Sequence, residues 1–293
     1  MNKGKWMVII GGVIVTVCLI ACIIAPERER RAENEKIGVI VTLLPQADFV
    51  EKVGGDHVKV TVMVPRGASP HTYEPTAGQL REVSRAQMYA KVGSGIEFEL
   101  TWFDKLREMN REMLVVDCSK GISLRGTEDE QEADPHIWTS PRNARVMVEN
   151  ICAGLIQIDP EHEAEYTANR DRYLQELDEV NAYIHERLDR YTKHRAFLIY
   201  HPAFGYFAAE YNLTQLAIEH EGKAPSPKVI QDCIDYARQY NLSYVYVTPQ
   251  FTTQAAEVIA HEIDGQIVFI DDLPLDYCAT MRSIAALLSL EME

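Results

Sequence analysis

The sequence is short of basic residues, and this shortage excludes one class of partner. Lysine and arginine together number 29 against 44 aspartate and glutamate residues, which leaves a formal net charge of −15. Proteins that bind nucleic acids draw most of their affinity from basic side chains set against phosphates. We therefore expect no nucleic-acid partner. The acidic excess instead favours a cationic ligand or a role in solubility.

Cysteine is also scarce, and none of the six cysteines forms a C-x-x-C pair. This spacing argues against a metal site built from cysteines. Four of the six lie beyond the N-terminal segment, and we expect them to be buried free thiols: Cys118, Cys152, Cys233 and Cys278.

One long uncharged run stands at the N-terminus. Lys3 and Lys5 precede 20 uncharged residues, 6–25, and about 20 apolar residues span a bilayer core. The pattern predicts a secretory signal or a membrane anchor. It contains the sequence LIAC, which ends at Cys22 and resembles the bacterial lipobox, whose cysteine is lipidated after cleavage. An uncleaved anchor is the alternative, and either one would tether an exported protein to the cell membrane on its periplasmic or extracellular side.

The rest of the chain alternates short apolar runs with helix-length segments. A charged tether completes an N-terminal part, residues 1–36. Two regions then carry four strand-like runs each: KIGVIVTLLP, VKVTVMVP, QMYAKVGS and LVVDCS in residues 37–158, and RAFLIYH, LTQLAIE, VYVTP and IVFID in residues 194–293. This alternation predicts an α/β fold with two lobes, each built on a mainly parallel four-stranded sheet.

Residues 159–193 differ from both lobes and predict one long connecting helix. Apolar residues recur there at steps of three and four, with charged residues between them, at Tyr173, Leu177, Val180, Ile184, Leu188 and Tyr191. Asp159-Pro160 is a plausible start, because proline is tolerated in the first helical turn. We expect a helix of about 30 residues, roughly 45 Å long, that forms a rigid spine between the lobes. One large core helix is the alternative.

Three histidines lie in short turn-like segments just past strands. They are His71 in PRGASPHTYEP, His136 in DPHIW and His201 in YHPAFGYF, and Asp271 ends the run IVFID. Histidine and carboxylate are ligands of tetrahedral Zn²⁺. Because ligands in parallel sheets bind beyond the carboxyl ends of the strands, these residues predict a metal site between the lobes.

Six ordered segments resemble the metal-binding lipoproteins of bacterial and archaeal ABC importers for zinc and manganese. They are PRGASPHTYEP, DPHIWTSPRNA, YHPAFGYFAAEY, HEGKAPSPK, VTPQF and IDDLPLDY, and the resemblance extends from about Ile37 to the end. It implies two lobes joined by one long helix with the metal in the cleft. It also implies a monomer that delivers its metal to an ABC permease with its ATPase.

The resemblance implies the metal ligands His71, His136, His201 and Asp271. Manganese-selective relatives typically carry Glu at the third position, whereas this chain has His201. Three imidazoles with one carboxylate suit Zn²⁺ better than Mn²⁺, which favours oxygen donors. Zinc carried as cargo is therefore the main prediction, and Mn²⁺, alone or with zinc, is the alternative.

Two functions of other classes compete with this one. A zinc hydrolase would use three histidine ligands with Asp271 as general base, but the chain lacks H-E-x-x-H or a comparable signature. A site closed by four protein ligands also leaves no coordination position for a reacting water. The third possibility is a surface adhesin whose metal is incidental.

Overall fold

The computed structural model describes residues 36–126, 133–193, 195–219 and 223–292. The predicted anchor with Cys22, and all but the last residue of the predicted tether, lie outside these ranges. The elements below belong to one compact unit that begins at Gly38, apart from Ile37 at the start of β1. No helix within the described ranges is both long and apolar enough to cross a membrane.

The first sheet has the strand order β2-β1-β3-β4. Strands β1 and β3 are parallel, as are β3 and β4, with Val39 opposite Met88 and Met88 opposite Leu114. Its strands are β1 (Ile37–Val41), β2 (Val58–Val62), β3 (Met88–Lys91) and β4 (Leu114–Asp117). The helices of this N-terminal lobe are α2 (Leu44–Gly54), α3 (Ala77–Val83), α4 (Glu97–Met109) and α5 (Pro141–Ile158).

The second sheet repeats the arrangement with the order β6-β5-β7-β8 and parallel pairing throughout. Its strands are β5 (Ala196–Ile199), β6 (Thr214–Ala217), β7 (Tyr244–Val247) and β8 (Gln266–Phe269). The helices of this C-terminal lobe are α7 (Gly205–Glu210), α8 (Pro227–Tyr240), α9 (Gln254–Glu262) and α10 (Tyr277–Leu290). The predicted α/β fold with two four-stranded sheets is confirmed, whereas the exact lobe boundaries remain a prediction.

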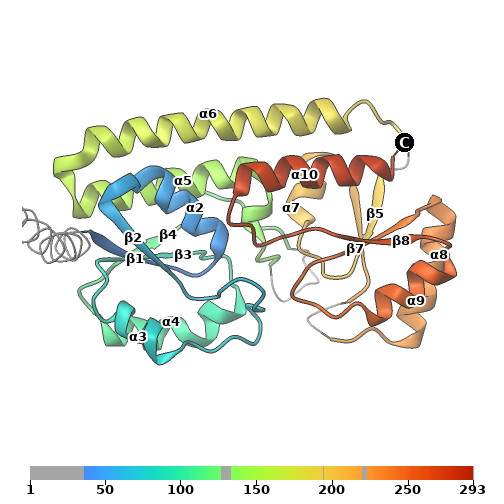
Figure 1. Ribbon diagram of the computed structural model, residues 1–293, viewed down its shortest axis with the longest axis horizontal. Helices are drawn as coiled ribbons and strands as arrows, with labels where there is room; N and C mark the ends of the chain where they lie inside the picture. Colours follow the sequence, from blue (N-terminus) through green and yellow to red (C-terminus); the bar gives the residue numbers. More distant parts are fainter. Residues whose placement is uncertain (1–35, 127–132, 194, 220–222, 293) are drawn as a thin grey trace, which may run out of the picture. The chain divides into compact units, whose positions relative to one another are not determined.

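The central strands of both sheets are apolar because helices cover both of their faces (Figure 1). Every residue of β5 is buried, and β1 ends in three buried residues. Such near-continuous apolar runs are typical of parallel strands covered on both sides. In each sheet the second strand lies on one side of the first strand, and the third strand lies on its other side. The strand order therefore reverses beside β1 and beside β5. Ligands bind beyond the carboxyl ends of the strands at such points.

The predicted long helix is α6 (Glu163–Leu188), with 26 residues and a length of about 39 Å. Five of the six residues of the predicted stripe are buried in it, as is Tyr166, whereas Tyr191 lies beyond its end. The helix also begins later than expected, because Asp159 ends α5 and Pro160 starts the 3₁₀ turn η3 (Pro160–His162). The 18-residue helix α5, which pairs with α6, was not predicted as a separate element.

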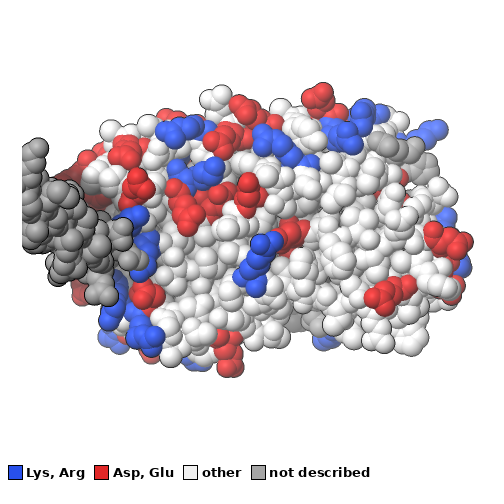
Figure 2. All heavy atoms as spheres, in the orientation of Figure 1, with Lys and Arg blue, Asp and Glu red and all other residues white. Residues whose placement is uncertain are grey.

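Helix α6 packs against α2, α5 and α10, and it runs past both sheets in Figure 1. It therefore acts as the predicted spine rather than as the core helix of one lobe. Acidic and basic side chains are interspersed along the edge where α6 lies (Figure 2), as expected for the polar face of an amphipathic helix.

A buried carboxylate joins the two lobes next to this spine. Asp48 of α2 accepts hydrogen bonds from the Tyr173 hydroxyl of α6 at 2.7 Å and from the Tyr277 backbone N–H of α10 at 3.3 Å. Burial raises the pKa of Asp48, and the hydrogen bond from Tyr173 opposes that rise. The four cysteines Cys118, Cys152, Cys233 and Cys278 are buried free thiols, as predicted.

Candidate metal centre

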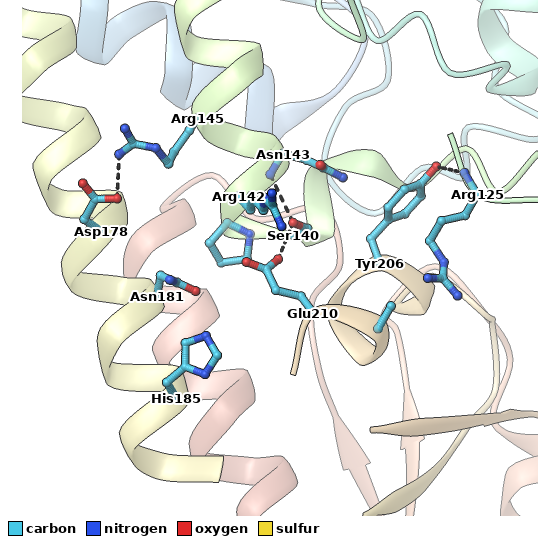
Figure 3. A pocket seen from close by; sticks show the side chains of 12 residues that line it. Arg125, Ser140, Arg142, Asn143, Arg145, Asp178, Asn181, His185, Tyr206 and Glu210 are labelled. Atoms are coloured by element: carbon cyan, nitrogen blue, oxygen red, sulfur yellow. Dashed lines mark hydrogen bonds and ion pairs between the residues drawn. The ribbon is translucent and has the colours of Figure 1, made fainter. Parts of the chain in front are cut away.

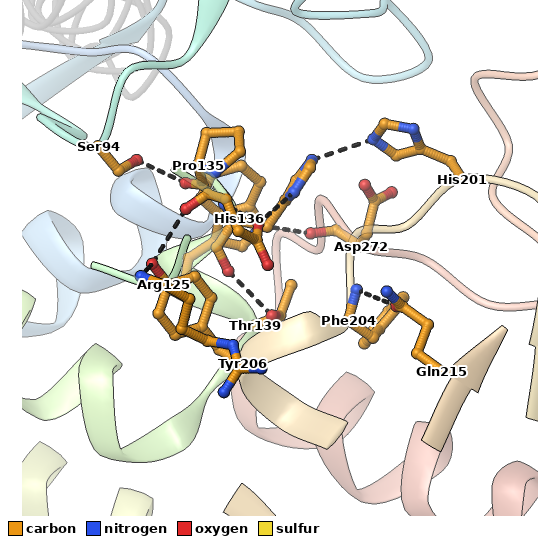
Figure 4. A network of polar contacts seen from close by, with 12 residues as sticks. Ser94, Arg125, Pro135, His136, Thr139, His201, Phe204, Tyr206, Gln215 and Asp272 are labelled. Atoms are coloured by element: carbon orange, nitrogen blue, oxygen red, sulfur yellow. Dashed lines mark hydrogen bonds and ion pairs between the residues drawn. The ribbon is translucent and has the colours of Figure 1, made fainter. Parts of the chain in front are cut away.

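Three imidazoles from different elements meet at the carboxyl ends of the strands. His201 follows β5, His136 precedes the 3₁₀ turn η2 (Ile137–Thr139), and His71 lies between β2 and α3. The Nε2 atoms of His136 and His201 are 3.0 Å apart, and the two side chains face one another in Figure 4. The ring centroids of His71 and His201 are 5.2 Å apart. The structure thus brings together the three histidines that the sequence singled out.

Each of these imidazoles has a carboxylate on its Nδ1 atom. His71 pairs with Glu97 at 2.8 Å, His136 with Asp134 at 2.8 Å and His201 with Glu219 at 2.5 Å. A carboxylate that accepts the Nδ1 hydrogen fixes the ring and leaves the Nε2 lone pair for a metal. Two nitrogens bound to one tetrahedral Zn²⁺ lie about 3.3 Å apart. The Nε2 pair of His136 and His201 therefore needs to move by only a few tenths of an ångström.

The pKa values of two imidazoles shift in opposite directions. The hydrogen bond to Glu97 raises the pKa of His71, although burial opposes it. Burial lowers the pKa of His201, although the hydrogen bond to Glu219 opposes it. His201 is therefore the imidazole that stays neutral, and ready to coordinate, at the lower pH.

The carboxylate that faces the histidines belongs to Asp272, the neighbour of Asp271, whose role as a ligand stays a prediction. Strand β8 ends at Phe269, and both aspartates lie in the turn that follows. Asp271 Oδ1 accepts the Leu273 backbone N–H at 3.0 Å. The Asp272 side chain points toward His136 and His201 (Figure 4), and its Oδ1 atom has no hydrogen-bond partner among the described residues. The turn after β8 therefore decides which of the two adjacent aspartates faces the histidines.

Asp272 is an unusual carboxylate for a protein interior. It is 4% exposed, and burial raises its pKa to about 6, while the nearby His201 opposes the rise. Its charge also contributes to the raised pKa of His71. A buried carboxylate without a full set of partners is costly unless a cation is nearby. Its position therefore favours a cationic ligand.

The four side chains are neighbours rather than a closed coordination shell. Within the described ranges, no group of three or more histidine, cysteine, aspartate or glutamate side chains has the arrangement of an assembled metal site. His71 differs from the other two histidines in exposure, because its side chain is 17% exposed, against 8% for His136 and 5% for His201. The Phe251 ring stacks on His201 with a centroid distance of 4.6 Å and covers that side of the site.

Glu74 and Asp134 lie close to predicted ligands in the sequence, which makes both candidates to orient an imidazole. Asp134 does contact His136, whereas Glu74 is exposed and Glu97 takes the partner position beside His71. Glu97 and Glu219 were not predicted. Glu219 ends the run LTQLAIE and follows β6, which pairs with β5 in parallel. His201 follows β5, so the sequence could have placed both residues at the same edge of the sheet.

The sequence also contains an acidic stretch, residues 128–130 and 132, that could attract cations, and a further candidate ligand, His220. These residues lie outside the described ranges.

A separate hollow of about 620 Å³ lies among the start of α5, α6 and α7 (Figure 3). Its lining includes three arginines, but the residues that line it include none of the three clustered histidines. Arg145 is paired there with Asp178 at 2.6 Å, and Glu210 accepts the Ser140 hydroxyl. These polar groups partner one another across the junction of three helices, so the hollow is distinct from the histidine site.

Two sheets with one cluster of ligands at their carboxyl ends define a two-lobed solute-binding protein. The chain belongs to the family described as ZnuA, zinc-uptake complex component A, periplasmic, whose model matches residues 39–289. The family consists of solute-binding proteins and not enzymes, which confirms the predicted resemblance and excludes the hydrolase hypothesis.

Relatives of this chain are named after different metals. The chain is 26% identical over 259 residues to the high-affinity zinc uptake system protein ZnuA of Bacillus subtilis (strain 168), covering 83% of this chain and 80% of that protein. It is 28% identical over 265 residues to the manganese-binding lipoprotein MntA of Halalkalibacterium halodurans, covering 87% of each. A crystal structure of a zinc-bound ZnuA deletion mutant is 36% identical, with a TM-score of 0.83, covering 88% of this chain and 98% of that chain.

Proposed function

We propose that this chain is the exported binding component of a zinc ABC importer. Its Zn²⁺ ligands are the Nε2 atoms of His71, His136 and His201 and the carboxylate of Asp272. The observation that carries the proposal is that each imidazole has its Nδ1 atom on a carboxylate, and that the Nε2 atoms of His136 and His201 lie 3.0 Å apart, where one Zn²⁺ would replace the proton between them. Family membership and the zinc-bound ZnuA structure support the same cargo.

Manganese is the second candidate cargo, because one relative is named a manganese-binding lipoprotein. The donor set favours zinc. Three imidazole nitrogens and one carboxylate form a mainly nitrogen site, whereas Mn²⁺ favours oxygen donors. We therefore expect zinc to outcompete manganese.

The remaining parts of the function concern transfer and location. We propose that the protein is a monomer held at the cell membrane through lipidated Cys22 or an uncleaved anchor. There it delivers zinc to a permease that is coupled to an ATPase. A relative named as a lipoprotein supports this location, and the family name supports a role within an uptake complex.

The test is a competition titration of the purified protein with Zn²⁺ and Mn²⁺ against a chelator of known affinity. His136→Ala and His201→Ala should each weaken zinc binding strongly. The matched controls His162→Ala and His185→Ala should bind as the wild type does, because those side chains are partly exposed on or beside α6, where they pair with Asp159 and Asp189. Equal zinc affinity across all four variants would exclude the proposed site.

A further inference from the structure

The segment that carries His136 is held by a helix of the opposite lobe. The Tyr206 hydroxyl, near the start of α7, accepts the Arg125 backbone N–H at 2.8 Å and donates to the Asp134 carbonyl at 3.0 Å. The Asp134 N–H in turn donates to the Arg125 carbonyl at 2.6 Å. The Tyr206 hydroxyl therefore links the backbone at Arg125 to the backbone at Asp134, just before His136 (Figure 4).

The Asp134 side chain transmits this contact to the imidazole. Its Oδ1 atom accepts the His136 backbone N–H at 2.9 Å and pairs with the His136 Nδ1 atom at 2.8 Å. The carboxylate thus fixes both the backbone and the ring of His136. A shift of Asp134 by a few tenths of an ångström would move the Nε2 atom that faces His201.

Gly205, the first residue of α7, leaves room for this carboxylate. A Cβ atom added at Gly205 would lie 2.3 Å from Asp134 Oδ2, which is far closer than van der Waals contact. The other carboxylate oxygen is bonded to His136, so Asp134 cannot turn away without releasing the ring. Glycine is needed here for close approach rather than for an unusual backbone conformation.

The far end of the same segment is also attached to α7. Glu210 accepts a hydrogen bond from the Ser140 hydroxyl, and Ser140 caps α5 by accepting the Asn143 backbone N–H at 3.1 Å (Figure 3). Helix α7 therefore contacts the segment from Asp134 to Ser140 at both ends, with His136 between them. His201 lies four residues before Gly205, so α7 also belongs to the chain that carries the facing ligand.

We infer that Gly205 and Tyr206 are positioning residues for metal binding, because together they seat Asp134 so that it holds His136 with its Nε2 atom toward His201. This inference rests on the proposed function and extends it. The pair formed by His136 and His201 is then assembled by protein contacts before metal arrives. His71 completes the site separately.

The test compares single substitutions on α7 with matched controls. Tyr206→Phe removes the hydroxyl, and we expect zinc affinity to fall about threefold to tenfold, because a net hydrogen bond has that value. Gly205→Ala displaces the carboxylate, and we expect a fall of about tenfold to a hundredfold, as for other partners of metal-ligating histidines.

The first control, Tyr211→Phe, deletes a hydroxyl that donates to Asn181 Oδ1 at 2.7 Å on α6 and does not touch the His136 segment. The second, Gly78→Ala, adds a Cβ in ordinary van der Waals contact, 3.6 Å from Thr76 Oγ1. Both controls should bind zinc as the wild type does. Affinity is measured by chelator competition with Zn²⁺ alone at one neutral pH.

A second readout separates positioning from general loss of stability. Nitrogen-15 NMR of the metal-free protein should show His136 as the Nδ1–H tautomer in the wild type and in both controls. It should show a mixture of tautomers in Tyr206→Phe and Gly205→Ala. A destabilised but folded protein would keep the wild-type tautomer.

The outcomes also distinguish this inference from the proposed function. If His136→Ala abolishes tight zinc binding while Tyr206→Phe and Gly205→Ala keep wild-type affinity and tautomer, the positioning role is wrong and the site stands. If His136→Ala binds zinc as tightly as the wild type, the proposed site itself is wrong. Equal losses in Tyr206→Phe and Tyr211→Phe would indicate a general loss of stability around α7 and would overturn the inference.

Discussion

The loop that carries His71 and the segment that carries His136 place their ligands by different means. Within the His71 loop, the Thr72 and Tyr73 N–H groups both donate to the Ser69 carbonyl, and the imidazole pairs with Glu97 of its own lobe. The segment from Asp134 to Ser140 instead contacts Tyr206 and Glu210 of the opposite lobe. One ligand is therefore positioned by local turns and the other by tertiary packing.

Further contacts hold the segment that carries His136, and the three histidines also differ in exposure. The Trp138 indole N–H donates to the Asp272 carbonyl at 2.7 Å, and the Ser94 hydroxyl donates to the Pro135 carbonyl at 2.5 Å. The side chain of His71 is 17% exposed, against 8% for His136 and 5% for His201. We therefore expect a buried pair of imidazoles that changes little on binding, and a more accessible third imidazole through which metal exchange begins.

The largest expected effect is on stability, and it tests whether the lobes are joined without metal. Zn²⁺ at a thousandfold excess over its Kd should stabilise the folded protein by about 4 kcal/mol, because it binds only the native state. Asp48 joins α2, α6 and α10 in the protein itself, so calorimetry should show one transition both with and without zinc.

Mn²⁺ should shift that transition less than Zn²⁺. A His71→Ala, His201→Ala double variant should show no shift with either metal. Two separate transitions in the metal-free protein, or stabilisation of one lobe alone, would contradict a site shared between joined lobes.

The second effect compares the two kinds of ligand directly. His136→Ala should lower zinc affinity by more than the roughly hundredfold upper range for an outer partner, because it removes a ligand of the preassembled pair. His71→Ala should lower it less, because the close pair of His136 and His201 remains in place together with Asp272. Chelator competition measures both, and a larger loss in His71→Ala would reverse the comparison.

The third effect concerns the carboxylate beside the buried pair. The folded-state pKa of Asp272 is about 6, above the value of about 3.9 in an unfolded chain. The folded protein then binds more protons than the unfolded chain between about pH 4 and pH 6, so the stability of the metal-free protein falls as pH rises through this window.

Asp272→Asn removes the buried charge. It should raise the free energy of unfolding of the metal-free protein at neutral pH by on the order of 1–3 kcal/mol, and it should reduce stabilisation by zinc. Denaturant titrations at about pH 4.5 and 7 check the sign. Asp271→Asn is the control and should change zinc binding little.

The smallest expected effect is on the pH dependence of zinc affinity, and it tests His71, the most exposed of the three histidines. The hydrogen bond to Glu97 raises the pKa of His71, so His71 is protonated at a higher pH than a free imidazole and competes there with zinc. In the wild type, zinc affinity should fall as pH drops below about 6.5.

Glu97→Gln should lower the pKa of His71 and move this fall to a lower pH. It should also weaken binding at neutral pH by about tenfold, because a neutral amide holds the ring less firmly than the carboxylate does. Proton NMR of the histidines, together with titrations between about pH 5 and 8, measures both quantities. An unchanged pH profile would show that His71 is not the ligand that competes with protons.

The sequence alone was sufficient for the order of elements and for the three histidines. Strands, amphipathic helices and turns are local patterns, so the eight strands and helix α6 were predicted close to their observed bounds. His71, His136 and His201 stood out because they follow strands or lie in turn-like segments. Helix α5 was not predicted, and α6 begins later than expected because Pro160 opens the 3₁₀ turn η3 rather than the helix itself.

Only the tertiary structure decided how the histidines are held. The choice of Asp272 over Asp271 depends on a turn closed by the Leu273 N–H. Tyr206 contacts Asp134 across 72 residues of sequence. Periodicity reports which residues share a face of one element, but it carries no information about which side chains of two lobes meet, because that depends on how whole elements pack.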